Sequence, residues 1–306
     1  MKRYLLLLAV SVLLLSPSVR AQKVDWFCAE PEVDDATTAR VNALLEKKKQ
    51  DRLKSIMDRP SGGGGTAPGA PAPPPASEAP KTIPVAVHVI TAGKEGHVPR
   101  EVFDVLLQNL NWGYRETPFR FRIQAVEYTD NPEWHERCGL NSANEVAMKQ
   151  RLAVDPEHVL NLYICKPEGG TVPSGTVGYG YYPWKSPEKP YLHGVVLHPR
   201  ALPMEGAIPE RNRGMTLVHE VGHYLGLYHT FDGGCGDAKG DFVDDTPTQG
   251  GPTMKCNMGY DSCPGVAGTD DVANYMNYTN DECMAHFTPG QIQRMIDSVE
   301  VFRPGL

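Results

Sequence analysis

The segment HEVGHYLGLYH, residues 219–229, contains the residue types and the spacing of a metal site. His219 and His223 are four residues apart, so on a helix both imidazoles project from the same face. Two imidazole nitrogens placed in this way bind a zinc ion as a pair. Glu220 follows the first histidine directly and can accept a proton from a water molecule at the metal. The segment therefore predicts hydrolytic chemistry at a zinc ion.

A glycine and a third histidine complete this segment. Gly226 tolerates the left-handed backbone that ends a helix, so His229 follows after a turn. Three neutral imidazoles leave one coordination position open for water, which is the arrangement of a catalytic zinc site. The alternative is three unrelated histidines. The full pattern arises by chance in only about 1 of 10⁴ such chains, so we prefer the metal site.

Later segments extend the pattern beyond the histidines. DFVDDTP spans residues 241–247, NYMNY spans 274–278 and CMAHFTPGQ spans 283–291. Together with HEVGHYLGLYH, these segments resemble the pappalysin family of metzincin zinc metallopeptidases, which includes ulilysin-like and other secreted microbial enzymes. The resemblance covers most of residues 81–306.

The resemblance implies a role for each residue of the site. The three histidines would bind one catalytic zinc ion, and Glu220 would act as general base and then as general acid. Met276 would form a hydrophobic floor under the ligands, although a single methionine is more often core packing. Tyr278 would stabilise the tetrahedral oxyanion, for which its phenol has a suitable but nonspecific donor.

The elements that must position these residues divide into two halves, because strands and helices alternate early and loops dominate later. We expect an α+β fold of the metzincin type, split by a horizontal cleft. A twisted mixed β-sheet with helices forms the upper subdomain, and a loop-rich, disulfide-stapled lower subdomain ends in a C-terminal helix. Alternation and apolar runs predict strands at 83–91, 119–128, 159–165 and 194–198. Besides the histidine helix, start signals predict helices at Pro99, Ser142 and Thr288.

The N-terminus has the pattern of a secretory signal peptide. Two basic residues, the apolar run Leu5–Leu15 and a small-residue cleavage site at Ala21 define it as residues 1–21. The apolar run is too short for a comfortable membrane anchor, which is the alternative. We therefore expect a secreted, extracellular protein that has no membrane contact after signal cleavage.

Two further segments precede the catalytic domain, which spans residues 81–306. Residues 61–80 consist mainly of Gly, Pro, Ala and Ser, so they form a linker. Residues 22–60 form an N-terminal pro-segment with a helix from about 34 to 58. One helix face collects apolar side chains and predicts a packing surface: Val41, Leu44, Leu45, Leu53, Ile56 and Met57.

The chain has seven cysteines, so one is left over if the others form disulfides. The resemblance implies the pairs Cys235–Cys263 and Cys256–Cys283, and we pair Cys138 with Cys165. This leaves Cys28, whose thiolate would be a fourth zinc ligand and would exclude the catalytic water. We hypothesise that residues 22–60 inhibit the enzyme through this cysteine switch. The alternative is an unpaired or adventitiously oxidised thiol, and WFCAEPE departs from the usual family context.

An acidic loop follows the third histidine. Its aspartates are interleaved with glycines, and such oxygen-rich loops hold Ca²⁺. Ulilysin-like enzymes carry calcium, so the resemblance also implies it here. The spacing is not that of an EF-hand, and the alternative is a solvated acidic loop. The loop contains Asp232, and the candidate ligands are Asp237, Asp241, Asp244 and Asp245.

Charge and composition narrow the function. The 306-residue chain has a formal charge of −7, which argues against nucleic acid as a partner. We expect a monomeric zinc endopeptidase that hydrolyses peptide bonds in proteins and peptides. One alternative is a secreted, non-catalytic metal-binding protein that retains the fold, and another is a hydrolase of non-peptide amides. The pocket walls that set the cleavage preference have no sequence signature here.

Overall fold

The computed structural model describes residues 27–58, 80–236 and 240–306. The predicted signal peptide and nearly all of the predicted linker therefore lie outside the described residues, as does Asp237. Within the described ranges, no helix combines the length and the apolar character needed to cross a bilayer.

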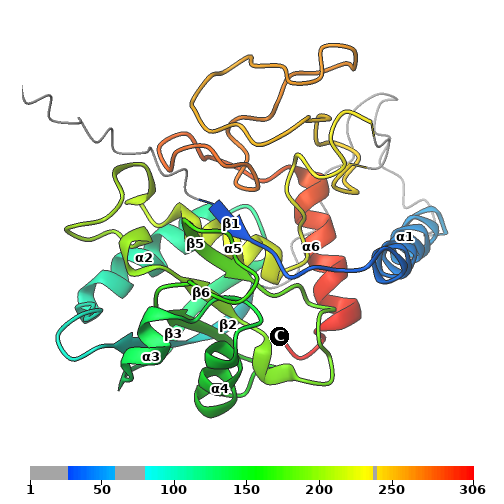
Figure 1. Ribbon diagram of the computed structural model, residues 1–306. Helices are drawn as coiled ribbons and strands as arrows, with labels where there is room; N and C mark the ends of the chain where they lie inside the picture. Colours follow the sequence, from blue (N-terminus) through cyan, green and yellow to red (C-terminus); the bar gives the residue numbers. More distant parts are fainter. Residues whose placement is uncertain (1–26, 59–79, 237–239) are drawn as a thin grey trace, which may run out of the picture.

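A six-stranded mixed sheet forms the centre of the upper subdomain (Figure 1). The strand order is β1-β5-β6-β4-β2-β3, and every neighbouring pair is parallel except β5–β6. β2 lies between β4 and the edge strand β3 and is almost wholly buried, as its valine-rich sequence predicts. The strands are β1 Phe27–Ala29, β2 Lys81–Thr91, β3 Phe119–Asp130, β4 Leu160–Ile164, β5 Thr176–Gly180 and β6 Val195–Leu197.

The helices α2, α4 and α6 begin where the start signals at Pro99, Ser142 and Thr288 predict, whereas the short helix α3 was not predicted. At α4, the Ser142 hydroxyl accepts from the amide of Glu145 at 3.0 Å. At α6, Thr288 and Gln291 form both bonds of the capping box. The helices are α1 Asp35–Met57, α2 Arg100–Gly113, α3 Pro132–Glu136, α4 Ala143–Leu152, α5 Met215–Tyr224 and α6 Pro289–Phe302.

Strand β5 was not predicted, because its sequence TVGYG contains two glycines, which have low strand propensity. The glycines are needed for the close approach of α5. A Cβ at Gly180 would lie 2.4 Å from the main-chain oxygen of Glu220, and one at Gly178 would lie 2.9 Å from its carboxylate. β5 therefore brings the sheet edge against the helix that carries the first two histidines.

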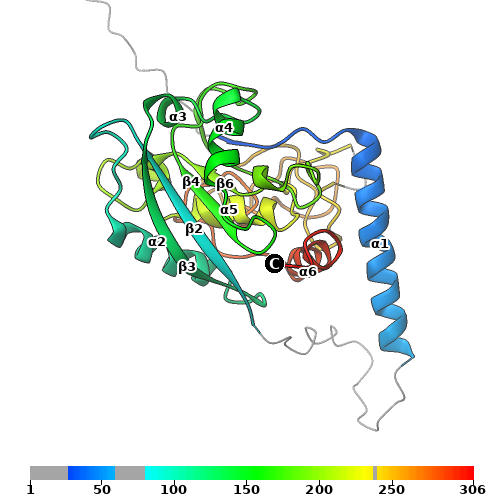
Figure 2. The same cartoon turned by 90° about the horizontal axis from the view of Figure 1, so that it is seen from below.

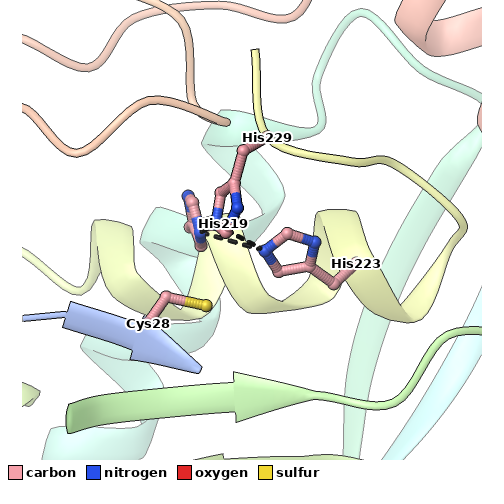
Figure 3. A group of neighbouring side chains, drawn as sticks. All are labelled: Cys28, His219, His223 and His229. Carbon is pink, nitrogen blue, oxygen red and sulfur yellow. Dashed lines mark hydrogen bonds between the residues drawn. The ribbon is translucent and has the colours of Figure 1, made fainter. Parts of the chain in front are cut away.

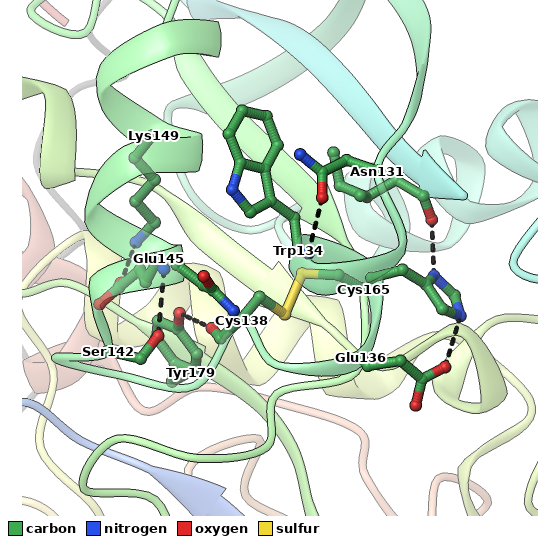
Figure 4. The surroundings of a disulfide bond; sticks show 12 residues. Asn131, Trp134, Glu136, Cys138, Ser142, Glu145, Lys149, Cys165 and Tyr179 are labelled. Atoms are coloured by element: carbon green, nitrogen blue, oxygen red, sulfur yellow. Dashed lines mark hydrogen bonds and ion pairs between the residues drawn. A yellow bond between two sulfur atoms is a disulfide. The ribbon is translucent and has the colours of Figure 1, made fainter. Parts of the chain in front are cut away.

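The lower subdomain is rich in loops and ends in α6, as predicted. Two disulfides, Cys235–Cys263 and Cys256–Cys283, close loops of this region. The third, Cys138–Cys165, lies in the upper subdomain near α4 (Figure 4). The three cysteine pairs named from the sequence are therefore all bonded, and Cys28 is the free cysteine among the seven, all of which lie in described ranges.

The N-terminal segment packs on the rest of the chain through two elements. β1 extends the sheet by pairing with β5, a contact that the sequence did not predict. α1 lies alongside α6, on the side away from the sheet (Figure 2).

The predicted packing face of α1 is only partly correct. Val41 and Leu45 are buried, whereas Leu44, Leu53 and Met57 are exposed. Only the first half of the helix rests on an apolar surface, and charged contacts dominate further along.

Candidate metal centre

Three imidazoles converge at the C-terminal part of α5 (Figure 3). The Nε2 atoms of His219 and His223 lie 3.1 Å apart, and the Nε2 atom of His229 lies 3.2 Å from each of them. All three residues are buried, with exposed fractions of 3%, 0% and 4%. The predicted ligands are thus brought to one point, with one nitrogen of each ring facing the others.

The protonation state of two rings suits a metal. His219 donates from Nδ1 to the carbonyl of Tyr275 at 2.7 Å, and His223 donates from Nδ1 to the carbonyl of Leu227 at 2.8 Å. Each Nε2 therefore carries a lone pair when the ring is neutral. Burial lowers the pKa of His219 well below its usual value and the pKa of His223 to about 4, so both rings are neutral at physiological pH. This donor set fits a zinc ion.

The turn after α5 delivers His229 as predicted. Gly226 has φ of 104°, a conformation that side chains of L-residues rarely adopt. The amide of Gly226 donates to the carbonyl of His223 at 2.9 Å, and the amide of Leu227 donates to the carbonyl of Gly222 at 2.9 Å. These bonds end the helix and reverse the chain within a few residues.

Met276 lies directly beneath the histidine helix. A Cβ at Gly222, between the first two histidines, would lie 2.4 Å from the sulfur of Met276. The turn before it is closed by Asn274, whose side chain accepts from the amide of Met276 at 2.9 Å. Met276 is fully buried in the main core, so the position fits the hydrophobic floor that the resemblance implied.

Glu220 is fully buried beside the imidazoles. Its Oε2 accepts from the thiol of Cys28 at 3.2 Å, while Oε1 has no hydrogen-bond partner in the described structure. Burial raises the pKa of Glu220 well above its usual value. A carboxylate in this environment is a strong proton acceptor, which suits a general base.

Tyr278 reaches the same point from the chain segment after Met276. Its hydroxyl donates to the main-chain carbonyl of Cys28 at 3.0 Å, and its ring centroid lies 4.9 Å from that of His229. Arg211 holds the main chain of this segment, with hydrogen bonds to the carbonyls of Tyr278 and Thr279. Arg211 is a positioning residue that the sequence did not indicate, because a lone arginine has no pattern.

Cys28 and Glu30 bring the N-terminal segment into the centre. The sulfur of Cys28 and the three histidine Nε2 atoms all lie within 4.8 Å of one another (Figure 3). The Glu30 carboxylate contacts Nδ1 of His229 and the hydroxyl of Tyr182. Although burial opposes ionisation, the charges of His229 and His223 lower the pKa of Glu30 to about 2. Glu30 was not predicted, because its only signal in the sequence was its position two residues after Cys28. It lies just beyond the end of β1.

The described aspartates of the acidic loop make separate contacts. Asp244 pairs with Lys49 at 2.6 Å, and Asp245 caps α6 by accepting from the amide of Gly290 at 2.8 Å. Asp232 accepts from the amide of His229 at 3.2 Å. Asp241 is buried with Oδ2 unpartnered among the described residues, and burial raises its pKa to about 7.

Comparison with known proteins decides the family. Residues 143–300 match the family Peptidase_M43, described as Pregnancy-associated plasma protein-A. An extracellular metalloprotease of Pyricularia oryzae is 37% identical over 228 residues, covering 73% of this chain and 77% of the relative. One of Arthroderma benhamiae is 37% identical over 229 residues, covering 73% and 74%. The chain belongs to the Peptidase_M43 family.

The family membership confirms the resemblance noted in the sequence. The protein is an extracellular metalloprotease, so the alternative of a non-catalytic metal-binding protein is not supported.

Solved structures confirm the fold. Mature mirolysin of Tannerella forsythia, in complex with a cleaved peptide, superposes with a TM-score of 0.59 at 26% identity, covering 72% of this chain and 91% of mirolysin. A promirolysin variant superposes with a TM-score of 0.64 at 23% identity, covering 90% of this chain and 94% of promirolysin. The metzincin-type architecture predicted from the sequence is therefore correct.

Proposed function

We propose that this protein is a zinc endopeptidase in which His219, His223 and His229 hold the metal. The observation that carries the proposal is the convergence of three Nε2 atoms within 3.2 Å of one another beside a buried carboxylate. When bound, zinc would supply Lewis acidity toward water and the scissile carbonyl. This set of three imidazoles leaves room for a further ligand, as catalytic sites require.

The protein's own groups move the protons of peptide hydrolysis. Glu220 accepts a proton from the attacking water as its oxygen bonds to the scissile carbon. The same carboxyl then gives that proton to the leaving amine as the C–N bond breaks. Tyr278 donates a hydrogen bond to the oxyanion. In support, the Tyr278 hydroxyl already donates to an amide carbonyl, that of Cys28.

Residues 22–60 act as an inhibitory pro-segment in this proposal. Cys28 would be the fourth ligand and Tyr278 would be engaged by its carbonyl, so neither water nor substrate could enter. Glu30 adds a second anchor on His229. The coverage of the mirolysin structures supports this division, because the mature form matches 72% of the chain and the longer proform 90%. Signal residues 1–21 and linker 61–80 complete the proposed division, with 81–306 as the catalytic domain.

The catalytic assignment is tested with Glu220→Gln in the activated enzyme and a protein substrate. Loss of the base is expected to lower kcat by at least about 100-fold while zinc content stays unchanged. His223→Ala is expected to lose zinc. His158→Ala is the matched control, since His158 lies on the surface paired with Asp155. Full activity in Glu220→Gln would refute the assigned base.

The switch is tested with Cys28→Ser and Glu30→Gln in purified full-length protein. Both variants should show activity before any proteolytic activation, whereas wild type should not. A Cys28→Ser variant as latent as wild type would contradict the switch, because serine is a poor zinc ligand.

Two further predictions concern ligands and assembly. We keep calcium as a proposal for the acidic loop, with Asp241 as the described residue whose Oδ2 is free to bind. Calorimetric titration of zinc-loaded protein should give heat that Asp241→Asn abolishes, and no heat in wild type would refute it. A monomer is expected, and multi-angle light scattering at several concentrations tests this.

A further inference from the structure

The face that α1 covers joins an aromatic floor to an acidic rim. Val41 and Leu45 insert against the buried rings of Tyr182, Trp184 and Tyr228. These two residues are one helical turn apart, so they form a single apolar contact. The face as a whole is named here the α1 docking face, and it consists of Tyr182, Trp184, Tyr228, Asp244, Asp297 and Glu300.

The rim of the α1 docking face is matched by basic residues of α1. Arg52 pairs with Asp297 at 2.7 Å, and Lys48 pairs with Glu300 at 2.7 Å. A third pair joins Lys49 to Asp244, and in all three the acid belongs to the catalytic domain. α1 itself contains six Lys and Arg residues against three acids, although the whole chain has a charge of −7.

One basic residue of the catalytic domain, Arg294, also lies near the α1 docking face. Arg294 of α6 donates to the side chain of Asn42 at 2.9 Å and to the carbonyl of Gly226 at 3.0 Å. Its guanidinium lies 5.0 Å from the ring centroid of Tyr228. It is therefore buried under the floor, and the outer rim is acidic.

The α1 docking face is continuous with the metal centre. The ring of Tyr182 lies edge-on to His223, with centroids 5.6 Å apart, and stacks on Trp184 at 5.0 Å. Beside the floor, a cavity of about 890 Å³ is lined by both α1 and the acidic loop. Departure of the pro-segment would therefore open a single surface that runs from the catalytic histidines to α6.

We propose that in the activated enzyme the α1 docking face is an exosite for substrates. It would bind basic, Lys- and Arg-rich helical segments that carry two apolar residues one turn apart, as α1 does. The proposal rests on the proposed function, because the face becomes free only when residues 22–60 leave. Substrates would then be proteins that have such a cationic segment near the cleaved bond, and the exosite would act on KM rather than on kcat.

The expected effect is modest and sensitive to salt. Ion pairs at a protein surface contribute little each, so the three pairs and the apolar contact together should lower KM by about 3- to 10-fold. Screening at 0.5 M salt should remove most of the ionic part, because the Debye length then falls to about 4 Å.

The test uses full-length protein in which a cleavage site for a sequence-specific protease is placed in the linker. That protease activates the enzyme, and the released pro-segment is then removed in high salt. Three substrates share one scissile peptide. The first has no extension, the second carries residues 35–57 through a flexible spacer on either side, and the third carries the same extension with Lys48, Lys49 and Arg52 replaced by Glu. Enzyme variants are Asp297→Asn with Glu300→Gln, and Glu282→Gln as a control at another exposed acid.

The second substrate should have a KM about 3- to 10-fold lower than the first or the third, at unchanged kcat. This factor is about what a few surface contacts contribute. Most of this advantage should be lost in Asp297→Asn/Glu300→Gln, where only the Asp244 pair and the apolar contact remain, and it should persist in Glu282→Gln. Equal KM values for the three substrates, or an advantage that is undiminished in the double variant, would overturn the exosite alone. Absence of cleavage of every substrate would overturn the proposed function, and the exosite with it.

Discussion

The turn at Gly226 decides whether the third histidine reaches the metal, so Gly226→Ala is an informative perturbation. With φ of 104°, alanine there is strained by about 1–2 kcal/mol, as for other residues forced to positive φ. The added Cβ would also lie 2.4 Å from the hydroxyl of Ser298 and 2.7 Å from its Cβ. Overpacking of a core position typically costs a further ~1–3 kcal/mol. We expect Gly226→Ala to lower the free energy of unfolding by about 2–5 kcal/mol.

The assay is urea unfolding of full-length protein that carries Glu220→Gln to prevent self-cleavage, with disulfides intact and zinc content measured in parallel. Gly251→Ala is the matched control, because a Cβ added there would have no atom within 4 Å and the φ of Gly251 is not positive. That variant should change stability by less than about 1 kcal/mol, and in the stabilising direction. Gly226→Ala should in addition weaken zinc retention, since His229 would shift.

A second substitution separates the two causes. The Ser298 hydroxyl is buried without a hydrogen-bond partner among the described residues, so Ser298→Ala removes the nearest obstacle at little cost. Gly226→Ala/Ser298→Ala should therefore regain about 1 kcal/mol of the loss, and the backbone strain should remain. A Gly226→Ala loss no larger than the change in Gly251→Ala would refute this account of the turn.

Three further predictions follow from buried and paired charges and from the metal. The hydrogen bond to Asp271 raises the pKa of His286, and although burial opposes it, His286 lowers the pKa of Asp271. The stability contributed by charged His286 is lost as pH rises through its raised pKa, and the stability contributed by ionised Asp271 is lost as pH falls through its lowered pKa. His286→Gln should therefore lower the free energy of unfolding most between about pH 4 and 6.5, as measured by unfolding at a series of pH values. Lys149→Met should lower the free energy of unfolding by about 3–5 kcal/mol, because Glu145 is then left buried and unpaired. Lys48→Met, at an exposed ion pair, should lower it by less than about 1 kcal/mol in the same urea unfolding assay. Equal losses in the two variants would contradict the burial argument. A chelator should abolish activity and lower the melting temperature of the activated enzyme, and added zinc should restore both; activity that persists after measured metal removal would contradict a metal-dependent reaction.

Lys149 has a structural role and not a catalytic one, because its charge is buried and paired within the fold. Its ammonium pairs with Glu145 at 2.7 Å (Figure 4). It also lies 4.2 Å from the ring centroid of Tyr181. Nothing in the spacing of the sequence distinguishes this lysine from the solvated lysines of α1. Its burial follows from α4 packing on strands that are far away in the chain.

Local patterns were sufficient wherever the relevant atoms lie within a few residues of one another. The helical period places His219 and His223 on one face, and a glycine is the residue that can make the turn before His229. The capping box at Thr288 was correct for the same reason, since both of its bonds are made within three residues. The convergence of the three histidines and the start of α6 could therefore be predicted without a structure.

The tertiary structure alone decided which distant segments meet. β5 forms by pairing with β6 and packing against α5, although its two glycines have low strand propensity. β1 pairs with β5 although Phe27 and Thr176 are far apart in the chain. Glu30 and Arg211 reach the metal centre only because segments distant in the sequence pack together there. Asp244 and Asp245 look alike in sequence, yet one pairs with α1 and the other caps α6. Residue type and spacing determine what a side chain can do, whereas the packing of remote elements determines which groups it meets.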